Sequence, residues 1–211
     1  MPNYNVKITN FNREEVIDYI RVQKNKNSNF KVVDVGGSVT SWSYPYIDAL
    51  IDFNDSESNI KHFKCDITHP DSWKDILEYV KINGKFDFCI CTHTLEDIMN
   101  PVYVCEQIQK ISKEGYIAVP SKFRELSRIE GFFRGYIHHR WIFDFKCGMF
   151  IGFPKINYIE NSLFNSIAND DENCADLSFF WKETIDIVYV NNNYLGPSAD
   201  AVKNYYNLLI Q

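Results

Sequence analysis

Between residues 30 and 120, short apolar segments alternate with segments of helical periodicity, and this alternation limits the fold more than any other feature. Five segments have the length and apolar composition of buried strands: 30–35, 48–53, 62–67, 86–93 and 115–120. Three segments carry apolar residues at helical spacing: 12–24, 70–82 and 101–111. Strands that alternate with helices form βαβ units. We therefore expect a Rossmann-like α/β fold, with a central mostly parallel sheet and helices on both of its faces.

The pattern changes from Gly131 onward. Three aromatic-rich runs, RWIFDF, GMFIGF and ETIDIVYV, predict strands that pair antiparallel at the C-terminal edge of the sheet. Residues 160–178 are polar and rich in Asn and Asp, so we expect a loop there, and 198–210 predicts a closing helix capped by Ser198. No repeat or linker divides the chain. We expect one domain over 1–211, with its core at 12–120 and further elements at 121–211.

Charge and cysteine usage exclude several classes of partner. The formal charge is −6 and no long Lys/Arg cluster occurs, which argues against nucleic acid as a partner. No stretch approaches the ~18 apolar residues of a membrane span, and the first residues lack the apolar core of a signal peptide. The six cysteines are scattered, as expected for reduced thiols in a cytoplasmic protein. Whether the chain forms a homodimer is left open.

Acidic residues follow three of the predicted strands, at the sheet edge where open α/β folds bind ligands. Asp34 precedes the glycine pair Gly36-Gly37 after the first strand, Asp52 ends the second, and Asp66 ends the third. Glycines allow the backbone to approach a ligand closely. A carboxylate after the second strand can accept both ribose hydroxyl protons, and one after the third can accept the exocyclic amine of adenine. The set therefore predicts a slot for adenosine.

This ordered set resembles class I S-adenosylmethionine-dependent methyltransferases over about residues 30 to 120. The segments RGYIHHRW (134–141), HTLEDIMNP and IAVPS are also similar to poorly characterised methyltransferase-like proteins of surface-glycan gene neighbourhoods and viruses. The resemblance implies an enzyme that uses S-adenosylmethionine to methylate a small-molecule or glycan-like acceptor. It also implies a set of cofactor-binding residues: Asp34, Gly36, Gly37, Asp52, Asp66 and Thr92.

The loop after the first predicted strand departs from the family's pattern. Ser38 and Thr40 stand where the second and third motif glycines would be, and Pro45 interrupts the short stretch before the next strand. We expect a very short helix or an irregular loop there, with Trp42 against a ligand. Two alternatives remain open. One is a catalytically inactive binding or scaffold domain on the same fold. The other is a nicotinamide-dependent oxidoreductase, which would need the full glycine set at a helix N-terminus.

Three histidines are the main candidates for the part of the site that would bind the methyl acceptor. His93 ends the fourth predicted strand, and His138 and His139 precede Arg140 between two aromatic residues. Histidine suits a general base near neutral pH, so the candidate catalytic residues are His93, His138 and His139, while Arg140, Tyr136 and Trp42 are candidates for binding the acceptor. The alternative is a structural histidine pair with Arg140 bonded to Glu130 or Glu125. A metal site formed by His138, His139 and a nearby acid is a further alternative. We expect no metal, because adjacent histidines on a strand point to opposite faces and would not easily share an ion.

Overall fold

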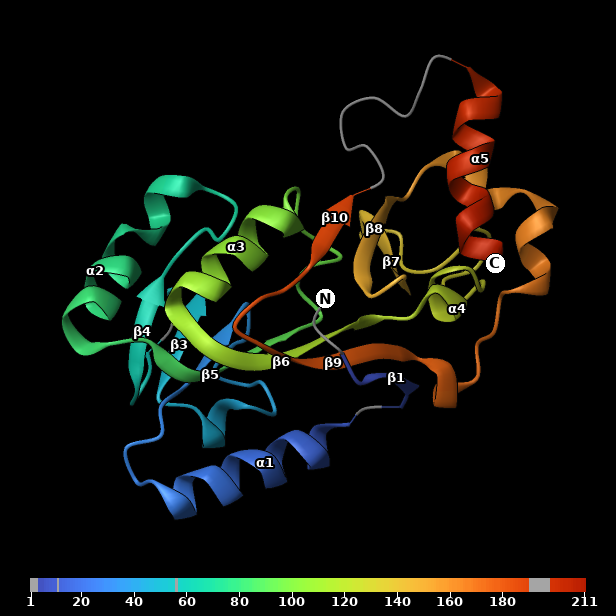
Figure 1. Cartoon of the computed structure of the whole chain (residues 1–211). Coiled ribbons are helices and arrows are strands. Elements are labelled where there is room, and N and C mark those ends of the chain that lie inside the picture. Colours follow the sequence, from blue (N-terminus) through green and yellow to red (C-terminus); the bar gives the residue numbers. More distant parts are fainter. Residues whose placement is uncertain (1–3, 11, 56, 190–197) are drawn as a thin grey trace.

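A seven-stranded sheet forms the centre of the molecule in the computed structural model, which describes residues 4–10, 12–55, 57–189 and 198–211 (Figure 1). The strand order is β1-β9-β6-β5-β2-β3-β4. The bounds of these strands are β1 Val6–Thr9, β2 Val32–Val35, β3 Ala49–Asp52, β4 Lys61–Lys64, β5 Phe86–Thr92, β6 Ser112–Pro120 and β9 Asp176–Lys182. The pairs β2–β3, β3–β4, β2–β5 and β5–β6 are all parallel. The expected Rossmann-like α/β class is confirmed.

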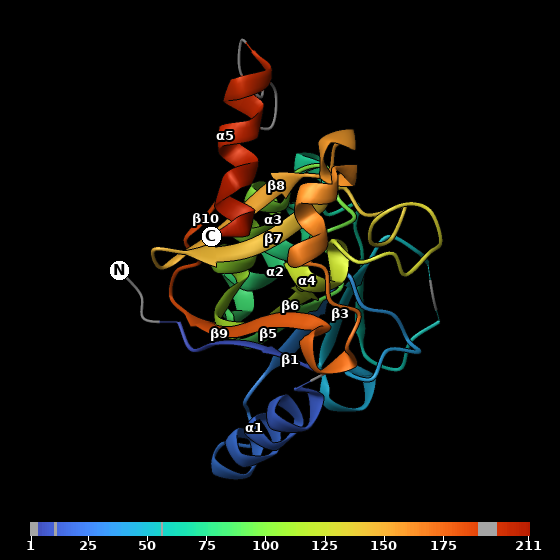
Figure 2. The ribbon, with the colours of Figure 1, turned by 90° about the vertical axis from the view of Figure 1, so that its right-hand side faces the viewer.

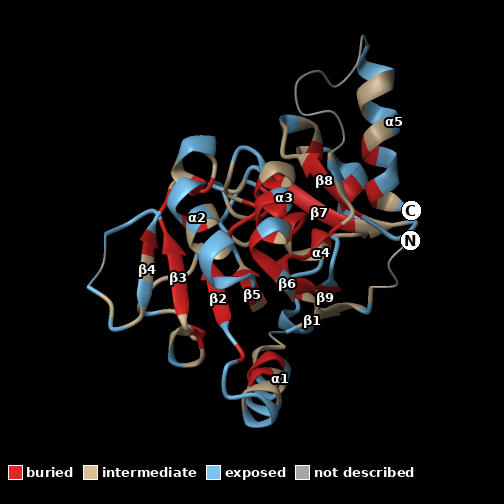
Figure 3. Ribbon diagram, turned by 60° about the vertical axis from the view of Figure 1, so that its left-hand side comes forward, coloured by how far each residue is buried: buried red, intermediate tan, exposed pale blue. Residues whose placement is uncertain are grey.

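Helices cover both faces of this sheet because successive strand residues point to opposite sides. Val32 packs with α1 (Arg13–Lys26) in one apolar cluster, whereas Val33 packs with α2 (Lys74–Asn83) and α3 (Pro101–Ile111) in another. Figure 1 shows α1 on one side and α2 with α3 on the other, and Figure 3 shows burial concentrated in the strands between them. The 3₁₀ turn η2 (Pro70–Trp73) leads into α2 and buries Trp73.

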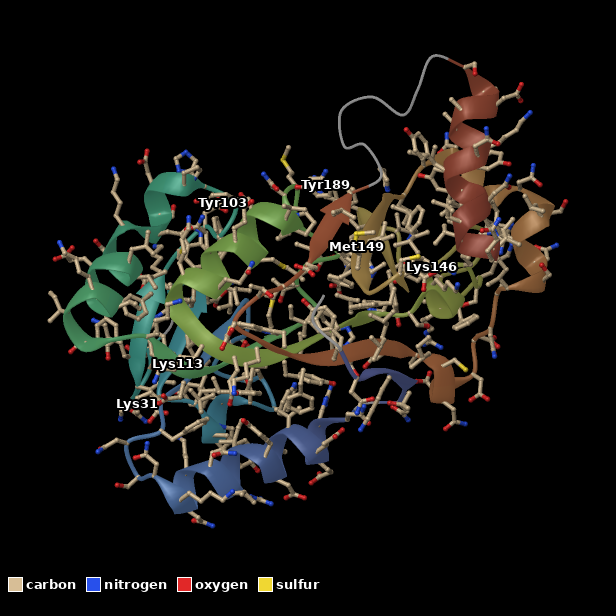
Figure 4. All side chains as sticks on the ribbon, in the orientation of Figure 1. Lys31, Tyr103, Lys113, Lys146, Met149 and Tyr189 are labelled. Carbon is tan, nitrogen blue, oxygen red and sulfur yellow. The ribbon has the colours of Figure 1, made fainter. Side chains whose placement is uncertain are left out.

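The chain reverses its direction of travel across the sheet between β2 and β5. From β2 it continues to β3 and β4 on one side, and it returns to β5 and β6 on the other. The carboxyl ends of strands at such a switch point are where open α/β sheets bind ligands. Lys31 and Lys113, labelled in Figure 4, mark the opposite, amino edge of the sheet.

Two strands of the main sheet were not expected. β9 lies antiparallel between β6 and β1, and β1 in turn runs antiparallel to β9. The expectation of a loop through residue 178 is therefore wrong at its C-terminal end, since β9 begins at Asp176. The antiparallel strand is also not at the edge, because β1 lies outside it. Asp176 consequently enters the sheet at its carboxyl edge, opposite Pro120.

The aromatic runs form a second sheet and do not extend the edge of the first. Its order is β10-β8-β7, from β7 (Trp141–Lys146), β8 (Met149–Pro154) and β10 (Ile187–Tyr189). β7 and β8 pair antiparallel, but β8 and β10 pair parallel. Figure 2 shows this sheet above β6 and β9, with α5 (Ala199–Ile210) beyond it. Ser198 caps α5 as expected, because its side chain accepts a hydrogen bond from the Ala201 amide.

Short elements connect the two sheets. α4 (Lys122–Glu125) follows β6 directly, and Ser121 forms an isolated parallel bridge with Phe143 of β7. The link between β2 and β3 contains only the 3₁₀ turn η1 (Tyr44–Tyr46), which confirms the expected absence of a regular helix there. Three further 3₁₀ turns occupy the polar stretch before β9: η3 (Asn157–Glu160), η4 (Ser162–Ser166) and η5 (Glu172–Cys174).

All six cysteines are free thiols, and four of them are buried. Cys89 and Cys91 lie in the same apolar cluster, as their spacing in a strand requires. Among the described residues, no helix combines the length and the apolar character needed to cross a membrane.

Candidate functional site

A cavity of ≈ 290 Å³ opens at the carboxyl ends of β3, β4 and β5, beside the switch point. We call it the strand-end cavity. Its wall includes two of the predicted acids, Asp52 and Asp66, together with Gly36, His93, Thr94 and Asp97. The alternation of strand and helix thus brings together residues that lie up to sixty positions apart in the chain. The cavity is near the lower end of the size range of small-molecule sites.

Asp52 is the carboxylate best placed to receive a ligand in this cavity. It is the last residue of β3 and is only 9% exposed. Among the described residues, its side chain has neither a hydrogen-bond nor an ion-pair partner within the protein. Because Asp52 lies in the cavity wall, a ligand hydroxyl in the cavity could donate to its carboxylate.

Asp66 has both a structural and a ligand-facing role available. Its Oδ1 accepts hydrogen bonds from the Thr68 amide at 3.0 Å and the Thr68 hydroxyl at 2.6 Å, which forms the turn before η2. Asp66 therefore stabilises a local turn. The same residue also lines the strand-end cavity, so the turn fixes where the carboxylate lies.

The two glycines after β2 make room for the protein's own side chains. Gly36 has φ +84°, and a Cβ there would overlap with Thr94. A Cβ on Gly37 would overlap with the Asp34 carboxylate. Gly36 lies in the wall of the strand-end cavity and Gly37 does not, and the space that a Cβ would occupy at each glycine is filled by the protein's own side chains.

The buried carboxylate of Asp34 holds the loop that follows β2 through hydrogen bonds. Asp34 is 2% exposed, and its carboxylate accepts hydrogen bonds from the Ser43 hydroxyl and the Gly37 amide. Burial raises the pKa of Asp34 to about 6; the bonds from Ser43 and Gly37 oppose this shift, and the nearby Asp52 carboxylate adds to it. Asp34 lines neither the strand-end cavity nor the cavity described next.

A second cavity of ≈ 290 Å³ adjoins the first and shares His93 and Asp97 with it. We call it the histidine cavity. Tyr136, His138 and His139 lie in its wall, as predicted for the acceptor side. Four charged residues that the sequence did not single out for this role complete it: Glu96, Arg124, Glu172 and Asp176. The two cavities therefore form adjacent compartments on either side of one histidine.

His93 at this junction has an unusual backbone. Its φ is +49°, a left-handed conformation that is strained for a residue with a side chain. Its amide donates to the Ala118 carbonyl at 2.9 Å, which holds the turn against β6. Strain of this kind persists where surrounding structure enforces it, and it is concentrated at functional sites.

The His93 imidazole lies between two buried carboxylates. Nδ1 is 3.4 Å from Glu96 Oε1, and Nε2 is 3.4 Å from Asp176 Oδ2. Burial by itself lowers the pKa of His93, but Asp176 and Glu96 outweigh burial and raise it to about 10. At neutral pH His93 therefore already carries its proton. This protonation state does not suit the expected role as a general base, and it suits a cation that fixes two acids.

His138 and His139 lie in a turn before β7 and not on a strand. The alternation that would separate their side chains does not apply, and that reason for excluding a shared ion is wrong. The two rings are 4.4 Å apart between centroids, and Tyr136 lies 4.7 Å from the His139 ring. His139 is bonded through Nδ1 to Glu125 Oε1 at 2.6 Å.

Besides Asp34 and Gly37, three predicted site residues lie outside both cavities. Trp42 and Thr92 line a separate space of ≈ 10 Å³, where the Arg13 guanidinium lies 5.9 Å from the Trp42 ring. Arg140 is exposed, and its backbone amide donates to the Glu96 carbonyl at 2.7 Å. The expected partners of its side chain are engaged elsewhere: Glu125 with His139 and Lys155, and Glu130 with the Ile137 amide.

Asp176 could have been found from sequence only by recognising β9, whose apolar LSFF run follows a polar stretch that we expected to be a loop. Glu96 and Asp97 were visible after the fourth predicted strand, but their position suggested a turn. Arg124 and Glu172 carry no local signal, because contacts distant in sequence bring them to the cavity.

A larger cavity of ≈ 630 Å³ lies at the other edge of the sheet, beside α1. Tyr19 and Glu114, hydrogen-bonded to each other, lie in its wall with Phe88 and Phe180. It contains none of the predicted site residues. Since parallel strands present their functional loops at the carboxyl edge, we place the candidate site at the two smaller cavities.

Comparisons with known proteins do not assign a function to this site. No protein-family model matches the sequence, and no curated protein does. Among solved structures, the chain is similar to the N-terminal domain of EvdMO1 crystallised in the presence of SAH and D-fucose, with 10% identity, coverage of 82% of this chain and 84% of that one, and a TM-score of 0.40. The same domain with SAH bound gives 8% identity, coverage of 79% and 80%, and a TM-score of 0.40. These values are too low to transfer an activity to this chain.

Proposed function

We propose that this protein is an S-adenosylmethionine-dependent methyltransferase that acts on a small, glycan-like acceptor. The observation that carries the proposal is the pair of adjoining cavities at the carboxyl edge of the sheet, which share His93 and Asp97. A cofactor in one compartment and an acceptor in the other would meet at this junction. Catalysis by methyl transfer depends mainly on such proximity and alignment.

The strand-end cavity fits the adenosine part of the cofactor. Asp52 offers a buried carboxylate that has no hydrogen-bond or ion-pair partner among the described residues, as two ribose hydroxyls require. Asp66, on the neighbouring strand end, is held by Thr68 where it can accept the adenine amine. S-adenosylmethionine would supply an electrophilic methyl group, and the protein's own residues would hold it beside the histidine cavity.

The histidine cavity fits a polar acceptor. Its wall carries both acids and bases, and sugar hydroxyls can donate to the former and accept from the latter. The protonated His93 holds Glu96 and Asp176 in place, so an acceptor hydroxyl would find fixed carboxylates there. No nucleic acid or membrane partner is included in the proposal, since the protein is acidic.

The filled space at Gly36 and Gly37 favours a second candidate, a binding or scaffold domain that has lost methyl transfer. A cofactor that needed close contact with this loop would find the Thr94 and Asp34 side chains there instead. The two candidates differ in whether the strand-end cavity binds the cofactor.

Calorimetric titration with SAH tests the choice. We expect the native chain to bind SAH and Asp52→Asn to bind it about 10- to 100-fold more weakly, because hydrogen bonds to a charged group are lost. Asp55→Asn is the matched control, since Asp55 is an exposed acid three residues away that forms an ion pair with Lys64 at the surface. Folded protein that does not bind SAH at millimolar concentration would overturn the proposal and favour the scaffold. Equal binding by Asp52→Asn would remove Asp52 from the site.

A further inference from the structure

Two turns that are distant in sequence place three potential metal ligands together in the wall of the histidine cavity. Asp97 follows β5, whereas His138 and His139 precede β7. One oxygen or nitrogen atom from each residue can be chosen so that all three lie within 4.8 Å of one another. Asp97 Oδ1 is 3.6 Å from His139 Nε2 and 3.8 Å from His138 Nε2.

Backbone hydrogen bonds beside the cluster hold the two turns together. The Glu96 carbonyl accepts from the amides of Arg140 and Trp141, at 2.7 and 3.2 Å. The Trp141 indole donates to the Ile98 carbonyl at 2.8 Å. Because these bonds flank Asp97 on one turn and follow His139 on the other, the three side chains are positioned by the backbone before any ligand binds.

His139 has the support that metal-bound histidines have. Its Nδ1 is bonded to the buried Glu125 carboxylate at 2.6 Å, and Lys155 Nζ holds the other Glu125 oxygen at 2.9 Å. A carboxylate that accepts from Nδ1 leaves the lone pair of Nε2 available for a metal and fixes the ring orientation. That Nε2 is the atom that points toward Asp97.

Asp97 Oδ1 is an acceptor that a bound cation would complement. The atom is buried, and among the described residues it has no hydrogen bond. Its two imidazole neighbours are beyond hydrogen-bonding distance. Ligands around a tetrahedral ion with bonds of about 2.0 to 2.1 Å lie about 3.3 Å apart. Shifts of a few tenths of an ångström in the two aspartate–histidine distances, and of up to about 1.5 Å between the two imidazoles, would therefore bring all three atoms onto one ion.

We propose that Asp97, His138 and His139 bind one divalent transition-metal ion, of which Zn²⁺ is the probe. Two imidazoles and one carboxylate suit such an ion, whereas Mg²⁺ and Ca²⁺ prefer oxygen ligands alone. Three protein ligands leave a coordination position directed at the cavity, as in sites that bind a substrate or water. If the proposed methyl transfer holds, an acceptor hydroxyl bound there would lose its proton more readily. The metal site itself does not depend on that function.

The test uses the tag-free chain of residues 1–211 after treatment with a chelator. We expect one equivalent of Zn²⁺ in calorimetry and mass spectrometry, and visible absorption from one equivalent of Co²⁺ that Zn²⁺ displaces and millimolar Mg²⁺ does not. His138→Ala should weaken Zn²⁺ binding by at least about 10- to 100-fold. This side chain is 65% exposed, so the variant should fold. Asp97→Asn should give a similar loss.

Two matched controls separate this site from incidental binding. His69→Ala removes an exposed histidine elsewhere, and Cys147→Ser removes the exposed thiol; both should bind Zn²⁺ as the native chain does. No stoichiometric binding, or unchanged binding by His138→Ala, would overturn the proposal. SAH titration of His138→Ala in chelator should match the native chain. A chain that binds Zn²⁺ but not SAH would overturn the proposed function alone.

Discussion

The two cavities at the carboxyl edge have the same volume but are built in different ways. The strand-end cavity takes its residues from consecutive strand ends, so regular parallel pairing positions them. The histidine cavity takes its residues from turns and from the start of β9, and its wall spans positions 93 to 176. The way in which the strand-end cavity is built is a general property of an open α/β sheet. The histidine cavity depends on contacts that are specific to this sequence.

The elements around the histidine cavity are held together by buried charged residues. Glu125 is fully buried and bonded to His139 and Lys155, and Lys122 Nζ is bonded to Asp144 Oδ2 at 2.9 Å between α4 and β7. A buried polar network stabilises a structure only when each member has its partner. We therefore expect the histidine side to be sensitive to single charge removals, and the strand-end side much less so.

Removing Lys122 tests this difference with the largest expected effect. Lys122→Met leaves the buried Asp144 with Lys146 Nζ, at 3.3 Å, as its one remaining ion-pair partner among the described residues. We expect the free energy of unfolding in urea to fall by about 3 kcal/mol. Lys64→Met is the matched control for the strand-end side, since its pair with Asp55 is exposed, and it should cost less than about 1 kcal/mol.

The double variant Lys122→Met/Asp144→Leu shows whether the loss comes from the unpaired charge. It should recover most of the stability, because a buried pair can be replaced by apolar groups at little cost. Equal losses for Lys122→Met and Lys64→Met would mean that the two sides do not differ in this respect.

Asp34 is the exception on the strand-end side, and its pH dependence sharpens the comparison. Its folded pKa of about 6 lies above the ordinary 3.8, because burial disfavours the charged form. The folded state thus binds the proton more tightly than the unfolded state, so stability falls as pH rises from about 4 to 6 and is level above that. Asp34→Asn lacks this dependence.

Relative to Asp34→Asn, the native chain should lose up to about 3 kcal/mol between pH 4 and pH 7. Urea unfolding of both proteins across this range measures the difference, and other titrating groups cancel in it. Asp55→Asn, an exposed acid, should track the native chain at every pH. A difference between Asp34→Asn and the native chain that does not vary with pH would contradict the proposed burial of the charge.

The same contrast explains what the sequence could predict. The strands and helices between 30 and 111 follow from apolar periodicity, and α3 has the expected bounds. Asp52 and Asp66 reach the cavity because strand ends meet at one edge. Periodicity does not tell which strands pair, so β9 and β1 were missed, and the aromatic runs were assigned to the wrong sheet.

The roles of individual side chains were harder to predict than their positions. Gly36 and Gly37 are required, but their neighbours Thr94 and Asp34 explain why, and neither contact is visible in the sequence. The pair His138-His139 stood out as unusual. Its geometry could not be derived without knowing that it lies in a turn beside Asp97.

His93 belongs to both cavities, and the smallest expected change concerns its protonation. With its pKa raised to about 10 by Asp176 and Glu96 against the effect of burial, the ring should stay protonated from pH 6 to 8. In nitrogen-detected NMR of the metal-free chain, its ring signals should not shift across this range. Because folding raises the pKa of His93, the protonated ring stabilises the folded protein below pH 6.5, and this stabilisation is lost as pH rises toward 10. Asp176→Asn removes one carboxylate, so the signals should begin to titrate at lower pH. If His93 in the native chain lost its proton near pH 6.5, His93 would again be a candidate general base. A neutral His93 between the two cavities could then accept a proton from an acceptor in the histidine cavity.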